Sequence, residues 1–331
     1  MITLHSHPDN VELCKLKDGK KTTPVFWHPV RNKDLRLAVT DLSSFATEEM
    51  RDKFRLSQNQ MDLVLDHMKN GTEIEGGLQH KFFKVKRAIE DSLYSEMNLS
   101  DSPQELLLDY PDGSDTWGEL CLTCGASSSG KTYSAISKAL RCLDGPEKNR
   151  RRFVVISNEW EKDKTLAKLK KEKYRKYVTG VDVSDCSLDN SEHGCGQSFY
   201  EKEVKPHIEF AHEGTVILFD DPMDSCCAPQ LRKAINRLLR TARHDSVGIN
   251  FILHSIKSGI WSSTASSNCK YMVLFPRSQR GKVRDFLNKE IGCTLAEARD
   301  HVHDFGQVAR AMHVRLFSPQ CLISSKLIRL L

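Results

Sequence analysis

The sequence predicts an α/β fold in which helices flank a central, mainly parallel β-sheet. From about residue 117 onward, short apolar runs rich in β-forming residues alternate with segments of helix length. A glycine-rich loop follows the first of these runs, and a later run ends in two aspartates. Such alternation is typical of βαβ units, which build parallel sheets covered on both faces.

Each predicted element rests on its own pattern. The expected strands are short apolar runs bounded by turn-forming residues, and they cover residues 118–124, 153–157, 216–219, 249–254 and 271–275. Apolar residues recur at helical spacing in residues 132–142, 162–177, 198–212 and 229–244. In the last of these segments, one helix face carries Leu231, Ile235, Leu238 and Leu239.

The first 112 residues show a different pattern and are expected to form an N-terminal accessory α+β region, followed by the principal domain over residues 113–331. A hairpin is predicted over residues 2–27 with its turn near Gly19, and helices over 48–70 and 81–97. Turn-forming residues at 101–104 and 110–115 mark the boundary. Helices are expected over 281–290 and 295–303, and a β-like tail over 309–324 is expected to pack on the core.

Composition excludes several classes of protein. The 331 residues are 39% hydrophobic and 28% charged, without a low-complexity tract or a repeat, so disorder and solenoid folds are not expected. The most apolar stretches are five residues long, against about 20 for a membrane-spanning helix. The N-terminus lacks the pattern of a secretory signal, so we expect an intracellular protein whose eleven cysteines are not a disulfide framework.

The glycine-rich loop predicts a nucleotide phosphate site. Residues 125–132 fit the pattern G-x-x-x-x-G-K-[ST] without a mismatch, between a strand-like run and a helical segment. Backbone N–H groups of such a loop surround a phosphate, the lysine reaches the β- and γ-phosphates, and the threonine hydroxyl binds Mg²⁺. The predicted site for ATP and Mg²⁺ consists of Gly125, Ala126, Ser127, Ser128, Ser129, Gly130, Lys131 and Thr132.

The run over residues 215–221 ends in two acids and predicts the carboxylates that complete the site. Asp220 is expected to hold Mg²⁺ together with Thr132, and Asp221 to orient or deprotonate the attacking water. Glu159, just past the strand over residues 153–157, is a competing candidate for that base. This combination is typical of ASCE-type, RecA-like P-loop NTPases.

A polar residue at the end of a strand between the two predicted site strands senses the γ-phosphate in many such ATPases. The strand over residues 249–254 ends in His254 and Ser255, and either side chain is able to form that hydrogen bond. The sequence leaves the choice between them open.

Residues 238–255 resemble the segment of the FtsK/HerA superfamily that leads to its sensor strand, with Arg243 and His244 ahead of Gly248 and Ile249. The likeness extends over residues 117–290, includes the FPRSQRGKVRDFL segment, and is greatest to the poxvirus-type packaging ATPases of large DNA viruses. These motors usually have Gln where this chain has His254.

The resemblance implies a homo-oligomeric ring that hydrolyses ATP at its subunit interfaces and packages viral genomic DNA into capsids. Arg243, or alternatively Arg240, is then contributed to the γ-phosphate of the neighbouring subunit. The implied partners are double-stranded DNA and a capsid docking protein, and the implied location is the host-cell cytoplasm or the virion.

Basic residues suggest where DNA phosphates bind, within a net charge of +5. Residues 162–176 and the later group Arg277, Arg280, Lys282 and Arg284 are the candidate surfaces, although runs of charge are commonly solvated faces.

Zinc-like spacing occurs at Cys121 and Cys124, which Cys186, His193, Cys195, Cys226 or Cys227 would have to complete. Strand geometry places Cys121 and Cys124 on opposite sides, so no zinc site is expected.

Two other functions share the loop. A nucleotide kinase would transfer phosphate to a small acceptor, but no Arg-rich lid segment is evident, and the Asp220–Asp221 pair suits water as the nucleophile. A regulatory switch would bind nucleotide and gate a partner with negligible turnover.

Overall fold

The structure is a computed structural model that describes residues 2–4, 6–28, 46–70, 76, 78–110, 118–145, 151–184, 195–222, 225, 227–256 and 267–331. The chain falls into two compact units. The first comprises Met1–Leu13, Thr23–Asn98 and Leu330, and the second comprises Cys14–Thr22, Leu99–Arg329 and Leu331. The assignment of residues 1–112 to an accessory region stays a prediction.

The first unit contains three helices around a small core. They are α1 (Glu48–Phe54), α2 (Gln58–Asn70) and α3 (Leu78–Ser95), with strand β4 (Glu96–Asn98) directly after α3. The single helix predicted over residues 48–70 is two helices, because Arg55 after α1 has a φ of 52° and interrupts the helical path. The helices bury Leu56, Met61, Val64, Leu65, Phe82, Val85 and Ile89.

The predicted N-terminal hairpin is present. Strand β2 (Val11–Asp18) and strand β3 (Lys21–Trp27) are separated by a turn in which Gly19 has a φ of 58°, a conformation that glycine adopts without steric cost. Strand β3 pairs with β1 (Ile2–Thr3), and β2 pairs with β5 (Glu105–Leu107), both antiparallel.

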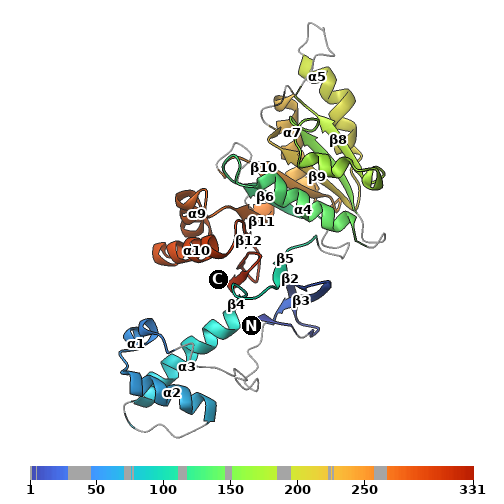
Figure 1. The fold of residues 1–331 in the computed structure, drawn as a ribbon. Helices are drawn as coiled ribbons and strands as arrows, with labels where there is room; N and C mark the ends of the chain where they lie inside the picture. Colours follow the sequence, from blue (N-terminus) through green and yellow to red (C-terminus); the bar gives the residue numbers. More distant parts are fainter. Residues whose placement is uncertain are drawn as a thin grey trace. The chain divides into compact units, whose positions relative to one another are not determined.

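A mainly parallel sheet forms the centre of the second unit (Figure 1). Neighbouring strands run in the order β11-β6-β10-β9-β7-β8, and each neighbouring pair in this series is parallel. Five of these strands confirm the predicted runs, and the predicted fold class is confirmed. The strands are β6 (Leu120–Cys124), β7 (Arg152–Ser157), β8 (Val178–Asp182), β9 (Thr215–Asp220), β10 (Gly248–Leu253) and β11 (Cys269–Leu274).

The C-terminal residues extend this sheet, as predicted for the tail. Helix α9 (Arg280–Phe286) runs into a π-helical turn (Leu287–Ile291) and is followed by α10 (Leu295–Val308). Strand β12 (Met312–Arg315) then pairs antiparallel with β11, and β13 (Cys321–Ile323) with β12, before β14 (Leu327–Leu330). Thr294 and Glu297 form a capping box that fixes the start of α10.

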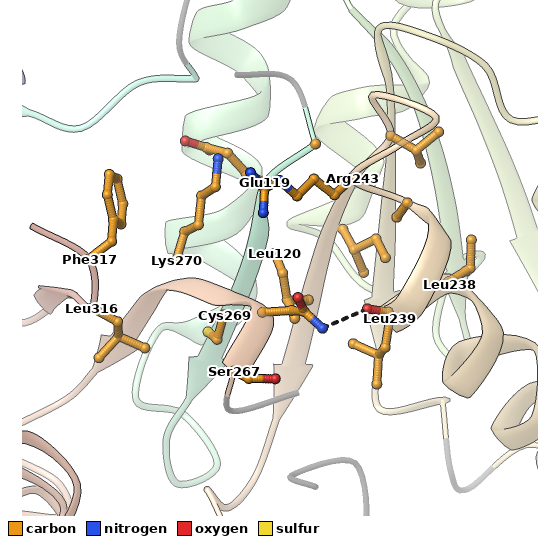
Figure 2. Close-up of a pocket in the computed structure, with 15 residues that line it drawn as sticks. Glu119, Leu120, Leu238, Leu239, Arg243, Ser267, Cys269, Lys270, Leu316 and Phe317 are labelled. Atoms are coloured by element: carbon orange, nitrogen blue, oxygen red, sulfur yellow. Dashed lines mark hydrogen bonds between the residues drawn. The ribbon is translucent and has the colours of Figure 1, made fainter. Parts of the chain in front are cut away.

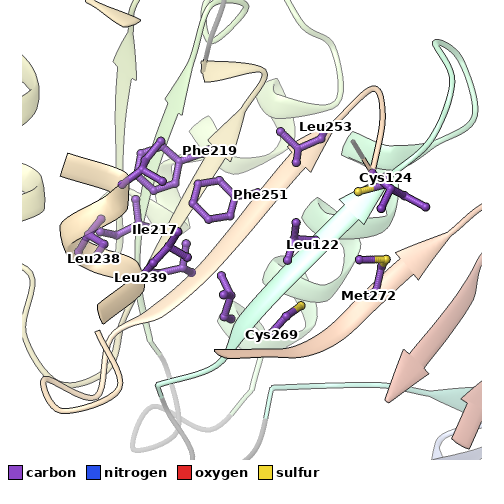
Figure 3. Packing of buried hydrophobic residues seen from close by; sticks show 14 of the residues in the cluster. Leu122, Cys124, Ile217, Phe219, Leu238, Leu239, Phe251, Leu253, Cys269 and Met272 are labelled. Atoms are coloured by element: carbon purple, nitrogen blue, oxygen red, sulfur yellow. The ribbon is translucent and has the colours of Figure 1, made fainter. Parts of the chain in front are cut away.

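Helices cover both faces of the parallel sheet. On one face, α4 (Lys131–Leu143) packs through Ile136 and Ala139 against alternate residues of β7 and β9. On the other, α7 (Ala228–Thr241) packs with α5 (Cys195–Phe199), the π-helical turn Tyr200–Val204 and α6 (Lys205–Glu209). The predicted apolar face of α7 is buried here, and the stacked rings of Phe219 and Phe251 lie beneath it with centroids 5.0 Å apart (Figure 3).

The helix predicted over residues 162–177 is wrong. This segment forms two 3-10 turns, Leu166–Lys170 and Glu172–Tyr174, and then the extra strand β8. The side chain of Asp163 accepts hydrogen bonds from the backbone N–H groups of Thr165 and Leu166, which favours a tight turn over a helix. The apolar residues that mimicked a helical face instead reach the core from these turns.

Among the described residues, no helix combines the length and the apolar character needed to cross a membrane.

Strand β8 depends on one glycine. A Cβ atom at Gly180 would lie 1.8 Å from Cε2 of the buried Trp160, whereas a Cβ atom at Gly281 meets nothing within 4 Å. We expect Gly180→Ala to lower the free energy of unfolding by about 1–3 kcal/mol through overpacking. Gly281→Ala, the matched control, should be neutral or stabilising because alanine favours helix. Urea unfolding of both variants tests this, and equal midpoints would contradict the Trp160 packing.

Candidate phosphate-binding site

The predicted phosphate loop leaves the carboxyl end of β6 and leads into α4. The N–H of Gly125 donates to the carbonyl of Leu253, the last residue of β10, at 3.1 Å. A Cβ atom at Gly125 would lie 2.5 Å from Oγ of Ser129 and 2.7 Å from Phe275, so only glycine fits. Gly130, the residue before α4, has a φ of 101°, which explains the second glycine of the pattern.

Lys131 opens α4 and turns its ammonium back over the loop. Its side chain is only 7% exposed, and Nζ donates to the carbonyl of Ala126 at 3.3 Å and to Nδ1 of His254 at 3.2 Å. The buried hydroxyl of Ser129 has no hydrogen-bond partner among the described residues. A bound phosphate would offer acceptors to both groups.

The register of the sheet brings the other predicted residues to the same edge. Leu253 of β10 is paired with Cys124 of β6, and Ile252 of β10 with Asp220 of β9. The three strands therefore end at one level, and the residues that follow them meet there. Strand β10 lies between β6 and β9, as the predicted sensor position requires.

Asp220 is a buried carboxyl group next to a second acid. Burial raises its pKa to about 7, the nearby carboxylates of Asp221 and Asp163 act in the same direction, and Ser157 and Lys131 oppose the shift. The Ser157 hydroxyl donates to Asp220 at 3.4 Å. A carboxyl group in this setting favours a cation beside it, because the cation stabilises the ionised form.

Asp221 adopts a backbone conformation that is uncommon outside glycine. Its φ is 44°, and its N–H donates to the carbonyl of Ile252 at 3.1 Å. Asn158, after β7, donates to the Asp221 carbonyl at 3.3 Å. These two bonds hold the turn, and the carboxylate Oδ2 lies 2.8 Å from Nε2 of His254.

His254 joins the loop lysine to the aspartate. An ammonium only donates hydrogen bonds and an ionised carboxylate only accepts them. Nδ1 of His254 therefore accepts from Lys131, and the N–H at Nε2 donates to Asp221, which corresponds to the neutral tautomer. The continuous chain Lys131–His254–Asp221 runs from the phosphate loop to the predicted base.

The oxygen ligands at this edge of the sheet suit Mg²⁺. The ion prefers oxygen ligands and needs few from the protein, because water and substrate phosphates supply the rest. Thr132 lies half-buried in the first turn of α4, and Asp220 presents the buried carboxylate described above. These are the two residues that would hold the ion.

Among the described residues, the side chains of the two alternatives left open by the sequence, Glu159 and Ser255, form no hydrogen bond or ion pair with His254 or Asp221. Glu159 is exposed in the turn after β7, where its carbonyl accepts from the N–H groups of Lys162 and Asp163. Ser255 is half-buried and follows His254. Of the candidate bases and sensors, Asp221 and His254 are in contact with each other.

Arg243 and Arg240 lie at the opposite edge of the sheet. Arg243 is exposed and precedes the amino end of β10, while His254 follows its carboxyl end. Strands rise about 3.3 Å per residue, so roughly 15–20 Å separate the two positions. A Cβ atom at Gly118 would lie 2.8 Å from Cα of Arg243, so that glycine allows the turn to pack beside the start of β6.

A cavity of about 380 Å³ opens at this far edge, between α7 and the amino ends of β6, β10 and β11 (Figure 2). Arg243, Glu119 and Lys270 line it, and the amide of Asn268 donates to the carbonyl of Leu239 at 3.0 Å. The cavity is thus separated from the phosphate loop by the length of the parallel strands.

Two further residues, which the sequence did not single out, touch the site. The amide of Gln279, just before α9, donates to the carbonyl of His254 at 3.3 Å. The guanidinium of Arg310 donates to the carbonyl of Ser128 in the loop at 3.4 Å. Both hydrogen bonds join residues far apart in the sequence, and no local motif marks them.

The surroundings of Cys121 and Cys124 disfavour a bound metal. Burial raises the pKa of Cys121 to about 11 and that of Cys124 to about 12, which disfavours the thiolate that a metal needs. Within the described part of the chain, no group of three His, Cys, Asp or Glu residues is placed to hold a metal ion. Three further candidates, Cys186, His193 and Cys226, lie outside the described residues, as does the side chain of Cys195.

Several solved structures are similar to this one. The genome packaging NTPase B204 from Sulfolobus turreted icosahedral virus 2, in complex with ATP-gammaS, is 15% identical with a TM-score of 0.37 over 64% of this chain and 96% of that chain. The pCW3 conjugation coupling protein TcpA, with ATPgS, is 12% identical with a TM-score of 0.37 over 64% and 61%. The cytoplasmic domain of the Thermomonospora curvata type VII secretion ATPase EccC is 12% identical with a TM-score of 0.40 over 71% and 29%.

These proteins are a genome packaging NTPase, a conjugation coupling protein and a secretion ATPase, while the FtsK/HerA resemblance of this chain, with its poxvirus-type detail, stays a prediction. At these identities and TM-scores the similarity assigns no function. No protein-family model matches the chain, and no curated protein matches it.

Two substitutions separate binding from hydrolysis at this site. Lys131→Ala removes the ammonium over the loop and should weaken ATP binding on the order of tenfold or more, the scale of a charge-assisted hydrogen bond. Asp221→Asn keeps the positive φ and the side-chain size, so ATP binding should persist while hydrolysis falls by about 10²–10⁴. Equilibrium binding and steady-state hydrolysis, measured on both, test this; full hydrolysis by Asp221→Asn would rule out the assigned base.

Proposed function

We propose that this protein is an ATPase that hydrolyses ATP at residues 125–132. The observation that carries the proposal is the hydrogen-bonded chain from Lys131 through His254 to Asp221, located where β6, β10 and β9 end. A phosphate loop alone would serve many nucleotide-binding proteins. A carboxylate tied through a neutral histidine to the loop lysine suits the cleavage of the terminal phosphate.

In the proposed mechanism, the loop N–H groups and Lys131 bind the β- and γ-phosphates. Asp221 accepts a hydrogen bond from water and orients it toward the γ-phosphorus. As the bond from the water oxygen to the γ-phosphorus forms, the bond to the β–γ bridging oxygen breaks, ADP leaves, and Asp221 takes the proton of the water. His254, which donates to Asp221 from Nε2, keeps that carboxylate aligned, while its Nδ1 accepts from Lys131. When held by Thr132 and Asp220, Mg²⁺ offsets the charge of the phosphates.

Hydrolysis fits these residues better than the alternatives do. A kinase needs an acceptor site beside the γ-phosphate, whereas the contact between Asp221 and His254 supports a carboxylate that activates water. A regulatory switch with negligible turnover has no need of Asp221 in its uncommon backbone conformation, since such strain persists mainly where function depends on it.

We further propose that the ATPase works as a ring. Arg243 is exposed and lies at the far edge of its own sheet, so it cannot reach the phosphates of its own loop. An arginine in that position is available to the loop of a neighbouring subunit, as the FtsK/HerA resemblance implies. Arg240 projects from the same end of α7 and stays the second candidate.

Double-stranded DNA is the proposed partner, and α9 is the first of two candidate surfaces. Arg280, Lys282 and Lys289 are exposed on or next to this helix, without an ion pair to any described carboxylate. In residues 162–176, Lys170 pairs with Glu161 at 2.8 Å and Lys173 with Asp144 at 2.6 Å, whereas other lysines of the segment are exposed, so it stays the second candidate surface. Gln279, which precedes α9, links that helix to the backbone of His254.

The remaining parts of the proposal follow from the resemblance. The motor would package viral genomic DNA into capsids through a docking partner, in the host-cell cytoplasm or attached to the virion.

Arg277, one of the candidate DNA-binding residues, donates to the carbonyls of Gly306 and Gln307 at the end of α10. Its charge is therefore engaged within the chain.

DNA should stimulate ATP hydrolysis, and α9 should carry the effect. The double variant Arg280→Ala with Lys282→Ala should lose most of the stimulation, and its DNA affinity should depend less on salt, by about 0.9 in logarithmic slope for each phosphate that is no longer neutralised. Lys173→Ala is the matched control because its charge is already paired. Hydrolysis rates with and without duplex DNA over a salt series measure both effects, and stimulation that survives in the double variant would refute the assignment of α9.

Mixed subunits test the proposed role of Arg243. Alone, Arg243→Ala should lower hydrolysis by about 10³–10⁵, the range for arginine fingers in other P-loop enzymes. Mixed with Asp221→Asn subunits, it should recover activity, because an intact Asp221 then meets an intact Arg243 across some interfaces. Mixed assemblies that stay inactive would contradict a role across the interface, and the same series with Arg240→Ala separates the two arginines.

A further inference from the structure

The strand topology brings an arginine from the C-terminal part of the chain to the phosphate loop. Leu274 at the end of β11 is paired both with Cys124 of β6 and with Met312 of β12. Because β12 runs antiparallel to β11, β12 begins at the edge where the phosphate loop lies. Arg310 stands two residues before that strand.

Two measurements place the Arg310 guanidinium against the loop itself. One terminal nitrogen donates to the carbonyl of Ser128 at 3.4 Å. A Cβ atom at Gly130 would lie 3.7 Å from Nε of Arg310, so the side chain runs beside the second glycine of the pattern. Two cations therefore lie at the loop: Lys131 belongs to it, and Arg310 contacts it from outside.

Arg310 is exposed, and no described carboxylate lies within ion-pair distance of its guanidinium. In this it differs from the arginines of the chain that form ion pairs. Its hydrogen bond to Ser128 is long and uses one of five N–H donors. Guanidinium groups bind phosphates through two parallel N–H donors. An arginine with free donors beside a phosphate loop thus has the chemistry and the position to bind the ligand of that loop.

Arg277 holds this arrangement in place. Its guanidinium donates to the carbonyls of Gly306 and Gln307, at 2.8 Å for Gln307, in the last turn of α10. The backbone then passes through Ala309, whose N–H donates to Phe305 at 3.0 Å, directly before Arg310. The segment that presents Arg310 is thereby fixed to the residues that follow β11.

We infer that Arg310 binds the diphosphate part of a nucleotide in its own subunit's loop, on the side away from the bond that is hydrolysed. In the sheet, β11 and β10 lie on opposite sides of β6. His254 and Asp221 reach the loop from the β10 side, and Arg310 reaches it from the β11 side. The inference rests on the proposed ATPase function, and it assigns Arg310 to binding, not to the cleavage step.

Binding of ADP and of inorganic pyrophosphate tests the inference. Arg310→Ala should weaken both by about tenfold, as expected when one charge-assisted hydrogen bond is removed. Arg310→Lys should recover only part of the affinity, because the ammonium keeps the charge but lacks the two parallel donors of the guanidinium. The matched control is Arg237→Ala, which should have no effect, because Arg237 is an exposed arginine of α7 that pairs with Glu209 of α6. In steady-state hydrolysis, KM should rise and kcat should stay unchanged, the signature of weaker uniform binding.

A second variant separates the role of the charge from a structural role. Arg310→Gln can still donate to the Ser128 carbonyl but carries no charge, so it should bind ADP as poorly as Arg310→Ala does. Wild-type affinity in Arg310→Gln or Arg310→Ala overturns the inference, and so does a fall in kcat without a change in KM. If the wild-type protein binds no nucleotide, both the proposed function and the inference fail. Only the inference fails if the wild type binds nucleotide, Lys131→Ala does not, and Arg310→Ala binds normally.

Discussion

The candidate site depends on one constraint: three neighbouring parallel strands end at the same level of the sheet. Strands β6, β10 and β9 are paired so that Cys124, Leu253 and Asp220 stand near one edge. Each strand is followed at once by a polar turn, because the apolar runs stop where burial stops. Three segments that lie apart in the sequence thus deliver a lysine, a histidine and an aspartate to one hydrogen-bonded chain.

The two edges of the sheet carry different parts of the proposed cycle. The carboxyl edge holds the phosphate loop, the proposed metal-binding residues and the proposed base. The amino edge holds Arg243, packed beside Gly118 at the start of the same strand that carries the loop at its other end. Under the proposed ring mechanism, a second copy would supply the arginine that cannot reach the loop of its own subunit.

Local sequence was sufficient to predict five of the six parallel strands and the loop, because short apolar runs and glycine spacing depend on neighbouring residues. It failed over residues 162–177, where apolar residues such as Leu166 and Leu169 imitate a helical face while Asp163 instead stabilises a turn, and it missed β8. Arg310 was also missed. Its position arises from antiparallel pairing between β12 and β11, a tertiary relationship that residue spacing near the loop does not contain.

Asp221 combines the proposed catalytic carboxylate with a backbone conformation that disfavours most side chains. At its φ of 44°, glycine would be unstrained and asparagine tolerable, whereas a β-branched or longer residue would cost roughly 1–3 kcal/mol. The turn accordingly favours a short acid over glutamate, and it stores energy that glycine would release. Under the proposed role of Asp221, stability and catalysis would therefore favour different residues at this position.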